Sequence, residues 1–255
     1  MKEIDRIYNE DCLVGMKDIP DGVVDFILTD LPFGITDAPF DIRIPFEPMW
    51  AQFKRVTKRG AAIALFANGK FLFELAASNL KDYRYKWIWF KTVRNGFLNA
   101  HKMPLKAHED ILIFYDKLPT YNPQKWKSTP YTRISRTKST NYSKGGWKEG
   151  CVTESPDGER MPIDVVKFNS ERVLWGKGEM YHPTQKPVDL LEYLIKTYTN
   201  EGELVLDATI GAGSTAVAAV NTGRHFIGFE TEKKYCDIAE ERIAKAQAEK
   251  AQALF

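Results

Sequence analysis

The run Val23–Thr29 (VVDFILT) is followed directly by Asp30, Leu31, Pro32 and Phe33. The run is rich in β-branched and aromatic residues and predicts a buried strand, and ligands of open α/β sheets bind outside the carboxyl ends of such strands. Pro32 keeps Leu31 out of helical dihedral angles, so the backbone stays extended. The Asp30 carboxylate and a main-chain carbonyl then form a pair of acceptors beside an aromatic face. That pair suits a flat ring with an exocyclic amine, although a strand-end turn with a core phenylalanine would look the same.

Apolar strand candidates alternate with amphipathic helix candidates along the chain. The predicted strands are Ile4–Tyr8, Val23–Thr29, Gly60–Ala67, Arg84–Phe90, Glu109–Tyr115, Leu204–Ala208 and His225–Phe229. The predicted helices are Cys12–Lys17, Pro48–Thr57, Lys70–Asn79, Val188–Tyr198, Ser214–Asn221 and Lys233–Lys250. This alternation predicts an α/β fold with a doubly wound, mostly parallel sheet.

Composition narrows the class of protein. A chain of 255 residues is long enough for one large domain, or for one domain with an added lobe. Cys12, Cys151 and Cys236 stand far apart, which predicts neither a disulfide framework nor a zinc site, and no metal is expected. No apolar run has membrane length and no signal-peptide pattern is present, so a soluble, cytoplasmic protein is expected.

The segment from Lys117 to Lys148 is strongly basic. It holds eight Lys and Arg residues and no Asp or Glu, although the net charge of the whole chain is only +2. Aromatic residues are interleaved with these cations, a composition that suits phosphate contacts together with base stacking, although a solvated loop-rich insertion would have the same composition. The candidate DNA contacts are Lys125, Trp126, Lys127, Arg133, Arg136 and Lys138.

A second stretch, Leu204–Thr215 (LVLDATIGAGST), predicts a strand, a glycine-rich turn and the start of a helix. Gly211 and Gly213 allow the backbone to approach a ligand closely, and Ala216 completes a G-x-G-x-x-A pattern. Glu230 follows at the end of the next predicted strand, where an acid can bind ribose hydroxyls. This is the general arrangement for dinucleotides, so NAD binding is an open alternative.

Polar residues beside the glycines favour a cationic ligand. Asp207 before them and Ser214 and Thr215 after them indicate a partly acidic pocket, which suits an ammonium or sulfonium better than a pyrophosphate. Upstream, the predicted helix that begins after Pro187 follows Thr184, Gln185 and Lys186. These donors, with one positive charge and the helix dipole, indicate a carboxylate site, although they would equally form a polar helix entry.

In this order the stretches resemble the S-adenosylmethionine-dependent DNA amino-methyltransferases of the β group, whose catalytic tetrapeptide precedes the cofactor motif. Asn9–Cys12 is similar to that family's Gly-Asp-Cys segment, and Ile44–Trp50 resembles a stretch of phage-borne members. The resemblance covers nearly the whole chain. It implies a class I methyltransferase-like fold with a circularly permuted motif order. It divides the chain into a catalytic half (1–116), a target-recognition insertion (117–170) and a cofactor-binding half (171–255).

The resemblance also implies a role for each motif. Asp30 and the Leu31 carbonyl would accept hydrogen bonds from the target amine, and Phe33 would stack on the base after it leaves the duplex. Leu31 and Phe33 depart from the proline and tyrosine that are commoner in the family, and Glu10 from its glycine, but the carbonyl and the ring are kept. The residues implied at the cofactor are Asp11, Cys12, Asp30, Thr184, Gln185, Lys186, Asp207, Thr209, Gly211, Gly213, Ser214, Thr215 and Glu230.

The implied reaction is methyl transfer from S-adenosylmethionine to the N6 amine of adenine in double-stranded DNA. Cytosine-N4 enzymes of the family more often begin the tetrapeptide with serine, so Asp30 favours adenine. Methylation of cytosine N4, of RNA or of a protein glutamine amide stays open, as do an NAD-dependent oxidoreductase and a catalytically silent DNA-binding module. A homodimer is also possible.

Overall fold

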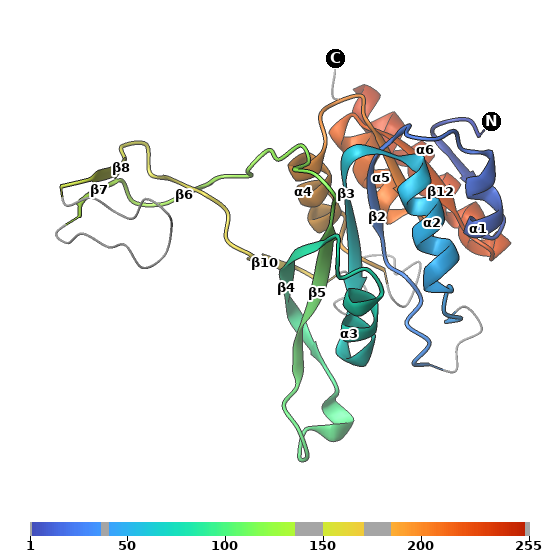
Figure 1. Cartoon of the computed structure of the whole chain (residues 1–255), viewed down its shortest axis with the longest axis horizontal. Helices are drawn as coiled ribbons and strands as arrows, with labels where there is room; N and C mark the ends of the chain where they lie inside the picture. The colour runs from blue at the N-terminus through green and yellow to red at the C-terminus, as the bar shows by residue number, and fades with distance from the viewer. Residues whose placement is uncertain (1, 37–40, 136–149, 171–184, 253–255) are drawn as a thin grey trace. The chain divides into compact units, whose positions relative to one another are not determined.

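The computed structural model describes residues 2–36, 41–135, 150–170 and 185–252. Contacts divide the chain into two units, of which the larger comprises 1–122 and 164–255 and the smaller 123–163. In the larger unit the described residues form one eight-stranded sheet (Figure 1). Its strands are, in spatial order, β1 (Arg6–Tyr8), β12 (His225–Phe229), β11 (Leu204–Asp207), β2 (Val24–Thr29), β3 (Thr57–Ala67), β5 (Lys106–Phe114), β4 (Tyr83–Asn95) and β10 (Val165–Phe168).

Only β5 runs antiparallel to the other strands of this described sheet, between β3 and β4. The strand order changes direction between β11 and β2, since β12 lies on one side of this pair and β3 on the other. In a doubly wound sheet such a reversal opens a crevice at the carboxyl ends of the two strands. The predicted fold class is therefore confirmed.

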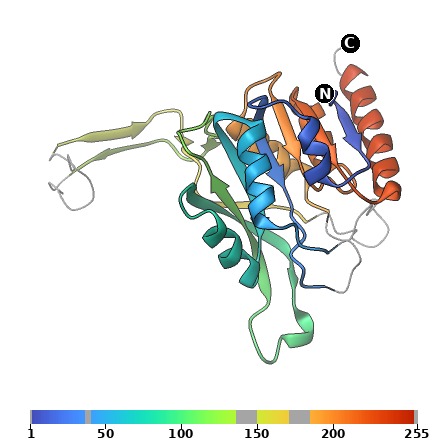
Figure 2. The same ribbon diagram turned by 45° about the vertical axis from the view of Figure 1, so that its right-hand side comes forward.

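Helices cover both faces of the sheet (Figure 2). They are α1 (Cys12–Gly15), α2 (Phe46–Val56), α3 (Gly69–Ser78), α4 (Val188–Tyr198), α5 (Ser214–Thr222) and α6 (Lys233–Gln252). Side chains of β3 show the alternation that two buried faces require. Ala62, Ala64 and Phe66 join the core under α4, α5 and α6, whereas Ile63 and Leu65 join the core under α1, α2 and α3.

The smaller unit carries two short two-stranded ladders in its described part. β6 (Trp126–Lys127) pairs with β9 (Glu159–Arg160), and β7 (Tyr131–Ile134) pairs with β8 (Val152–Ser155). The predicted insertion, 117–170, spans this unit and also contains β10, which pairs with β4 in the main sheet. None of the described helices is long and apolar enough to cross a membrane.

Candidate functional site

Two threonines join the carboxyl ends of β2 and β11, the two strands between which the strand order changes direction. The Thr29 and Thr209 hydroxyl oxygens are 2.8 Å apart, and the Thr209 hydroxyl donates to the Asp30 carbonyl at 2.9 Å. The residues that follow β2 and the residues that follow β11 are thus fixed to each other, although they are 180 positions apart in the sequence.

The acid that ends β11 shapes the glycine turn. One oxygen of Asp207 accepts from the Thr209 amide at 3.1 Å and the other accepts from the Thr215 hydroxyl at 2.6 Å. The residue is only 4 % exposed, and burial raises the pKa of the Asp207 carboxyl from 3.8 to about 6. Asp207 is therefore a carboxylate that the fold holds inside, with both oxygens already used.

The glycines of this turn have different functions. Gly211 has φ of +53° and an added Cβ would meet no atom within 4 Å, so its backbone faces open space. Gly213 has φ of +80° and its Cβ would lie 2.7 Å from the Cβ of Ala239 in α6, which makes it a packing position. Ser214 beside it accepts from Arg242 of α6 at 3.2 Å.

Glu230 and the segment after β1 border the same turn. The Glu230 carboxylate accepts from the Gly211 amide at 3.1 Å and from the Glu232 amide at 2.8 Å. The side-chain amide of Asn9 donates to the Glu230 carbonyl at 2.9 Å, which places the segment containing Asp11 and Cys12 beside it. Asp11 itself caps α1 by accepting from the Leu13 amide at 2.7 Å, and Cys12 is buried.

Asp30 lies in a buried cluster of alternating charges. One oxygen of Asp30 accepts from the Lys186 ammonium, which is also 3.5 Å from Glu109. Glu109 in turn pairs with Lys91. The exposed fractions of the four side chains are 23 % for Asp30 and between 10 % and 13 % for the other three. The second oxygen of Asp30, Oδ1, is buried and has no hydrogen-bond partner in the described part of the chain.

The charges of this cluster shift one another's pKa values. Burial raises the pKa of Asp30, an effect that the charge of Lys186 opposes and the charge of Glu109 reinforces. Burial disfavours the charged form of Lys186, but the charges of Asp30 and Glu109 outweigh it and raise the Lys186 pKa. Burial likewise acts against ionised Glu109, and Lys186 and Lys91 outweigh it and lower the Glu109 pKa. The cluster holds two acids and two bases, so as a group it is neutral.

Helix α4 brings Lys186 to Asp30. Its inner side is apolar, with Leu190, Leu194 and Ile195 fully buried. Its last residue, Tyr198, accepts from the Trp87 indole at 2.6 Å and lies 2.8 Å from the Tyr85 hydroxyl, which anchors the helix to β4. Since α4 precedes β11 and packs against the sheet, its first turn lies at the carboxyl ends of the parallel strands.

The backbone after the tetrapeptide is held by Asp41. Its carboxylate accepts from the amides of Gly34 at 2.7 Å, Ile35 at 2.9 Å and Thr36 at 2.8 Å. Burial works against the Asp41 charge, but these hydrogen bonds outweigh it and lower the Asp41 pKa. Phe33 is partly buried and stacks on Phe71 with the ring centroids 4.7 Å apart, so one face of the predicted stacking residue is already used.

The predicted DNA-binding residues lie in the smaller unit where they are described. Trp126 is 49 % exposed, and Arg133 is exposed on β7. Although the segment Lys117–Lys148 itself contains no acid, Lys125 and Lys127 have an acidic partner. Both pair with Glu159, at 2.8 Å and 3.7 Å, because β9 brings this acid from outside the segment to β6. Arg136, Lys138 and the cofactor candidate Thr184 lie outside the described residues.

Sequence reasoning missed Lys91, Glu109 and Asp41. Lys91 and Glu109 lie on adjacent antiparallel strands and meet Lys186 only through the fold, so no spacing in the sequence indicates the cluster. Gln185 and Lys186 were expected at a cofactor carboxylate. The structure pairs the charge of Lys186 with that of Asp30, and the role of both residues at a cofactor carboxylate stays a prediction. The described residues contain no group of three acids, histidines or cysteines that could hold a metal.

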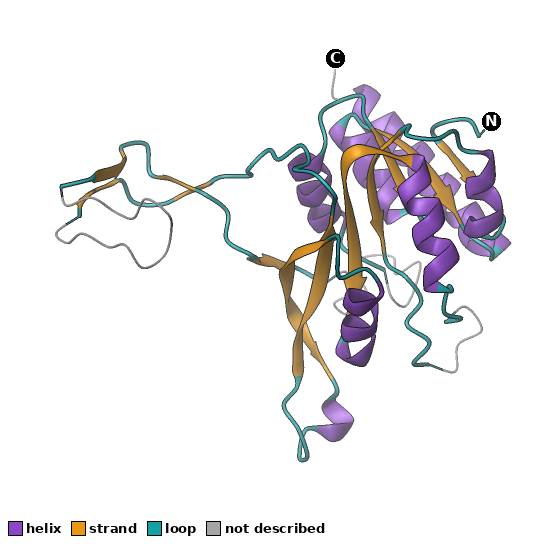
Figure 3. Ribbon diagram, in the orientation of Figure 1, coloured by secondary structure: helices purple, strands orange, loops and turns teal. Residues whose placement is uncertain are grey.

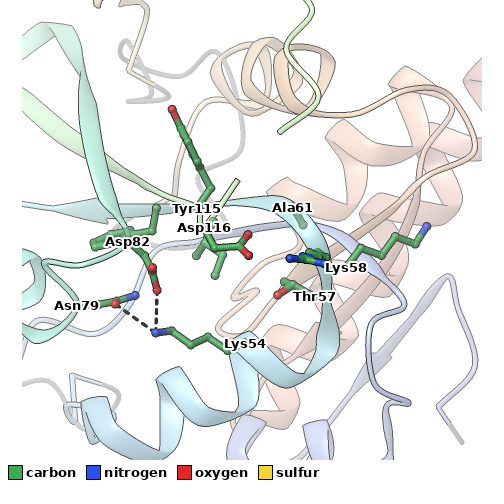
Figure 4. A pocket seen from close by; sticks show the side chains of 11 residues that line it. Lys54, Thr57, Lys58, Ala61, Asn79, Asp82, Tyr115 and Asp116 are labelled. Atoms are coloured by element: carbon green, nitrogen blue, oxygen red, sulfur yellow. Dashed lines mark hydrogen bonds and ion pairs between the residues drawn. The ribbon is translucent and has the colours of Figure 1, made fainter. Parts of the chain in front are cut away.

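A hollow of about 370 Å³ lies at the opposite edge of the sheet, around the start of β3 (Figure 4). Lys54 points across it to Asp82 at 2.7 Å and to Asn79 at 3.3 Å. Lys58, also in its lining, pairs with Asp25 at 2.6 Å. None of the predicted site residues lines this hollow. The candidate site is therefore taken at the carboxyl ends of β2 and β11, where Asp30, Asp207 and Thr209 meet.

Comparisons with known proteins place the chain among DNA methylases. A family model for DNA methylases of the N6/N4 type matches residues 24–241. The type II methyltransferase M.BglII of Bacillus subtilis is 32 % identical over 93 % of this chain and 68 % of its own length. M1.MboII of Moraxella bovis is 28 % identical over 94 % of this chain and 96 % of its own length.

Solved structures share the fold at lower identity. The M1.HpyAVI–SAM complex superposes with a TM-score of 0.62 at 23 % identity, covering 93 % of this chain and 98 % of that chain. The PvuII DNA methyltransferase, described as cytosine-N4-specific, superposes with a TM-score of 0.64 at 14 % identity, covering 95 % and 90 %.

Proposed function

Because the chain belongs to the N6/N4 DNA methylase family, we propose that it methylates the N6 amine of adenine in double-stranded DNA with S-adenosylmethionine as the methyl donor. The observation that carries this proposal is the buried Oδ1 of Asp30, an acceptor with no protein partner among the described residues. A target amine placed in the crevice would satisfy it.

The acceptor pair supplies the chemistry that an exocyclic amine needs. The lone pair of such an amine is delocalised into the ring, which makes the nitrogen a poor nucleophile. Hydrogen bonds to Asp30 Oδ1 and to the Leu31 carbonyl favour a pyramidal nitrogen and stabilise the positive charge that develops on it. Lys186, which is itself paired with Glu109, binds the other oxygen of the carboxylate, so Oδ1 keeps its direction.

The glycine turn fits the donor. S-adenosylmethionine supplies an electrophilic methyl group when it is bound. Gly211 faces open space, Glu230 lies at the turn to take ribose hydroxyls, and the residues from Asp11 border it on the side of β1. The acidic groups Asp207 and Glu230 favour a positively charged sulfonium over the pyrophosphate of NAD.

Asp30 at the first tetrapeptide position favours adenine, and cytosine N4 is the alternative. In a host that lacks DNA methylation, expression of the chain should leave N6-methyladenine at one sequence, which modified-base sequencing locates. If the DNA of that host carries N4-methylcytosine instead, the target base is cytosine and not adenine. Methyl incorporation into RNA or protein, with none into DNA, would contradict the proposal.

Asp30→Ala should reduce methyl transfer roughly a hundred- to thousandfold, the scale of losing an oriented group that stabilises developing charge. Calorimetry should find the affinity for S-adenosylmethionine within several-fold of wild type, because Asp30 faces the target base. Asp21→Ala is the matched control, since Asp21 precedes β2 at the other edge of the sheet and its side chain is 78 % exposed. Near wild-type turnover in Asp30→Ala would exclude the acceptor mechanism.

A further inference from the structure

The β4–β5 hairpin extends past the other strands of its sheet (Figure 3). Its far end runs from Thr92 to Lys106 and contains a short 3-10 helix, Phe97–Asn99. The Asn99 amide donates to the Gly96 carbonyl at 3.0 Å and the Lys102 amide donates to the Asn99 carbonyl at 2.9 Å. The tip is therefore a formed turn that presents its side chains in a defined way.

The tip exposes large apolar side chains. Phe97 is 75 % exposed and Leu98 is 84 % exposed, and Met103 and Leu105 beside them are 53 % and 40 % exposed. Adjacent apolar side chains presented together on a projecting turn are a binding feature rather than ordinary surface composition. Within its own unit, the described chain leaves these side chains uncovered.

The charge around the tip has one sign. Arg94, Lys102 and Lys106 are exposed, and the sequence from Thr92 to His108 contains no Asp or Glu. A partner of this surface must tolerate three cations and accept apolar side chains at the same time. Duplex DNA does both, because its phosphates bind cations and apolar side chains can insert between its base steps.

The hairpin projects from the end of the sheet at which Asp30 follows β2. β4 runs parallel to β2, so its end at Asn95 lies at the edge where Asp30 follows β2. Lys91 of β4 and Glu109 of β5 belong to the charge cluster around Asp30. A duplex whose base reaches Asp30 must therefore pass this edge, where the hairpin projects.

We propose that the hairpin tip is a DNA-binding surface, on which Phe97 and Leu98 enter the duplex beside the extruded base while Arg94, Lys102 and Lys106 bind phosphates. The inference rests on the proposed DNA methyltransferase function. Extrusion of a base leaves a gap in the stack, and DNA-bending proteins show that apolar side chains such as Phe and Leu can insert between base steps. The smaller unit would then read sequence while the tip stabilises the opened duplex.

The test uses the full chain with Phe97→Ser and Leu98→Ser combined, on a duplex that carries the mapped target. The variant should methylate the intact duplex at least about tenfold more slowly than wild type. On a duplex with an abasic site opposite the target base the loss should be much smaller, because opening that pair no longer requires the tip. Affinity for S-adenosylmethionine and the thermal unfolding midpoint should not change, since both side chains are mostly exposed.

Leu80→Ser is the matched control, an equally apolar change at a residue that is 69 % exposed and precedes β4 at the other edge. Equal losses on the two duplexes would overturn insertion into the stack. If the tip variant has the wild-type methylation rate and the wild-type affinity for the duplex, the tip is not a DNA-binding surface. A wild-type dimer in light scattering that the variant converts to a monomer would assign the tip to self-association instead. If the wild-type chain methylates no DNA, the proposed function is contradicted. The tip is then still tested by comparing the duplex affinity of the tip variant with that of wild type.

Discussion

Asp207 is a buried acid and Asp30 a partly buried one, both at strand ends, but their oxygens are used differently. Asp207 has both oxygens bonded to its own turn, whereas Asp30 keeps Oδ1 without a partner among the described residues. A buried acceptor left without a partner costs stability, and such costs collect at functional sites. At the scale of single residues, Asp207 thus shapes the turn, whereas Asp30 keeps one acceptor available, which fits its proposed role toward the target amine.

Asp207→Asn should stabilise the protein at neutral and alkaline pH. The folded-state pKa of about 6 lies above the ordinary 3.8, so ionised Asp207 costs stability above about pH 6, and the cost disappears as pH falls below about 4. The neutral amide avoids this cost, which corresponds to a gain on the order of 1–3 kcal/mol at pH 8 after the loss of one acceptor. Denaturant unfolding at pH 8 and pH 4 measures it. An equal gain in the free energy of unfolding at both pH values would show that it does not come from removing the ionised Asp207 carboxylate.

At the scale of elements, the charge cluster ties β2, β4, β5 and the entry of α4 together. Each of these elements contributes one member, namely Asp30, Lys91, Glu109 and Lys186. Displacement of any one element would leave a charge buried without its partner, which is strongly destabilising. The acceptor is therefore positioned by four segments that are distant in the sequence.

Glu109→Gln should reveal this coupling in the pH dependence of methyl transfer. The negative charge of Glu109 raises the pKa of Asp30, so without it Asp30 stays ionised to lower pH and the acidic limb of the rate profile should move to lower pH. Stability should fall by about 3 kcal/mol, because two buried lysines lose a shared anion. Asp237→Asn is the control, since it removes an acid from an exposed pair on α6. An acidic limb at the wild-type pH in Glu109→Gln would show that the charge of Glu109 does not influence the titration of Asp30.

Hydrophobic periodicity predicted the strong elements of the sequence well. The helix over Val188–Tyr198 and the strand over His225–Phe229 are confirmed, because each has an apolar pattern long enough to define its limits. The strand predicted over Arg84–Phe90 continues to Asn95, since the hairpin arm is polar and has no buried face to produce a pattern. The four-residue strand β10 was not predicted, for its pairing with β4 comes from a distant segment.

The site was predictable in parts. Strand ends and glycines are local signals, so Asp30, Asp207 and Gly211 could be identified from the sequence. The partner of Lys186 could not, because ion pairs across a sheet depend on tertiary placement that no sequence spacing records. The same reason explains why Glu159 was not expected to neutralise Lys125.

At the scale of the whole molecule, the smaller unit is the proposed reader of sequence. Neutralising Arg133 and Arg136 together should lower the slope of log DNA affinity against log salt by up to roughly 1.8, at about 0.9 for each phosphate contact. Lys125→Gln should change the slope less, because Glu159 already pairs with Lys125. Binding to cognate and scrambled duplexes over a salt series measures both variants. Lys245→Gln, on α6, is the control, and curves that superimpose on wild type would place DNA recognition elsewhere.

The separation of β2 from β11 along the chain also sets the order in which the sheet can be completed. β2 is a central strand, yet its neighbour β11 follows after most of the sequence, and the Thr29–Thr209 contact spans 180 positions. At ribosomal speeds of 5–20 residues per second, roughly 10–35 s pass between the synthesis of the two partners. During that interval one edge of an apolar strand is available to other chains. We therefore expect slower expression or added chaperones to raise the yield of folded protein.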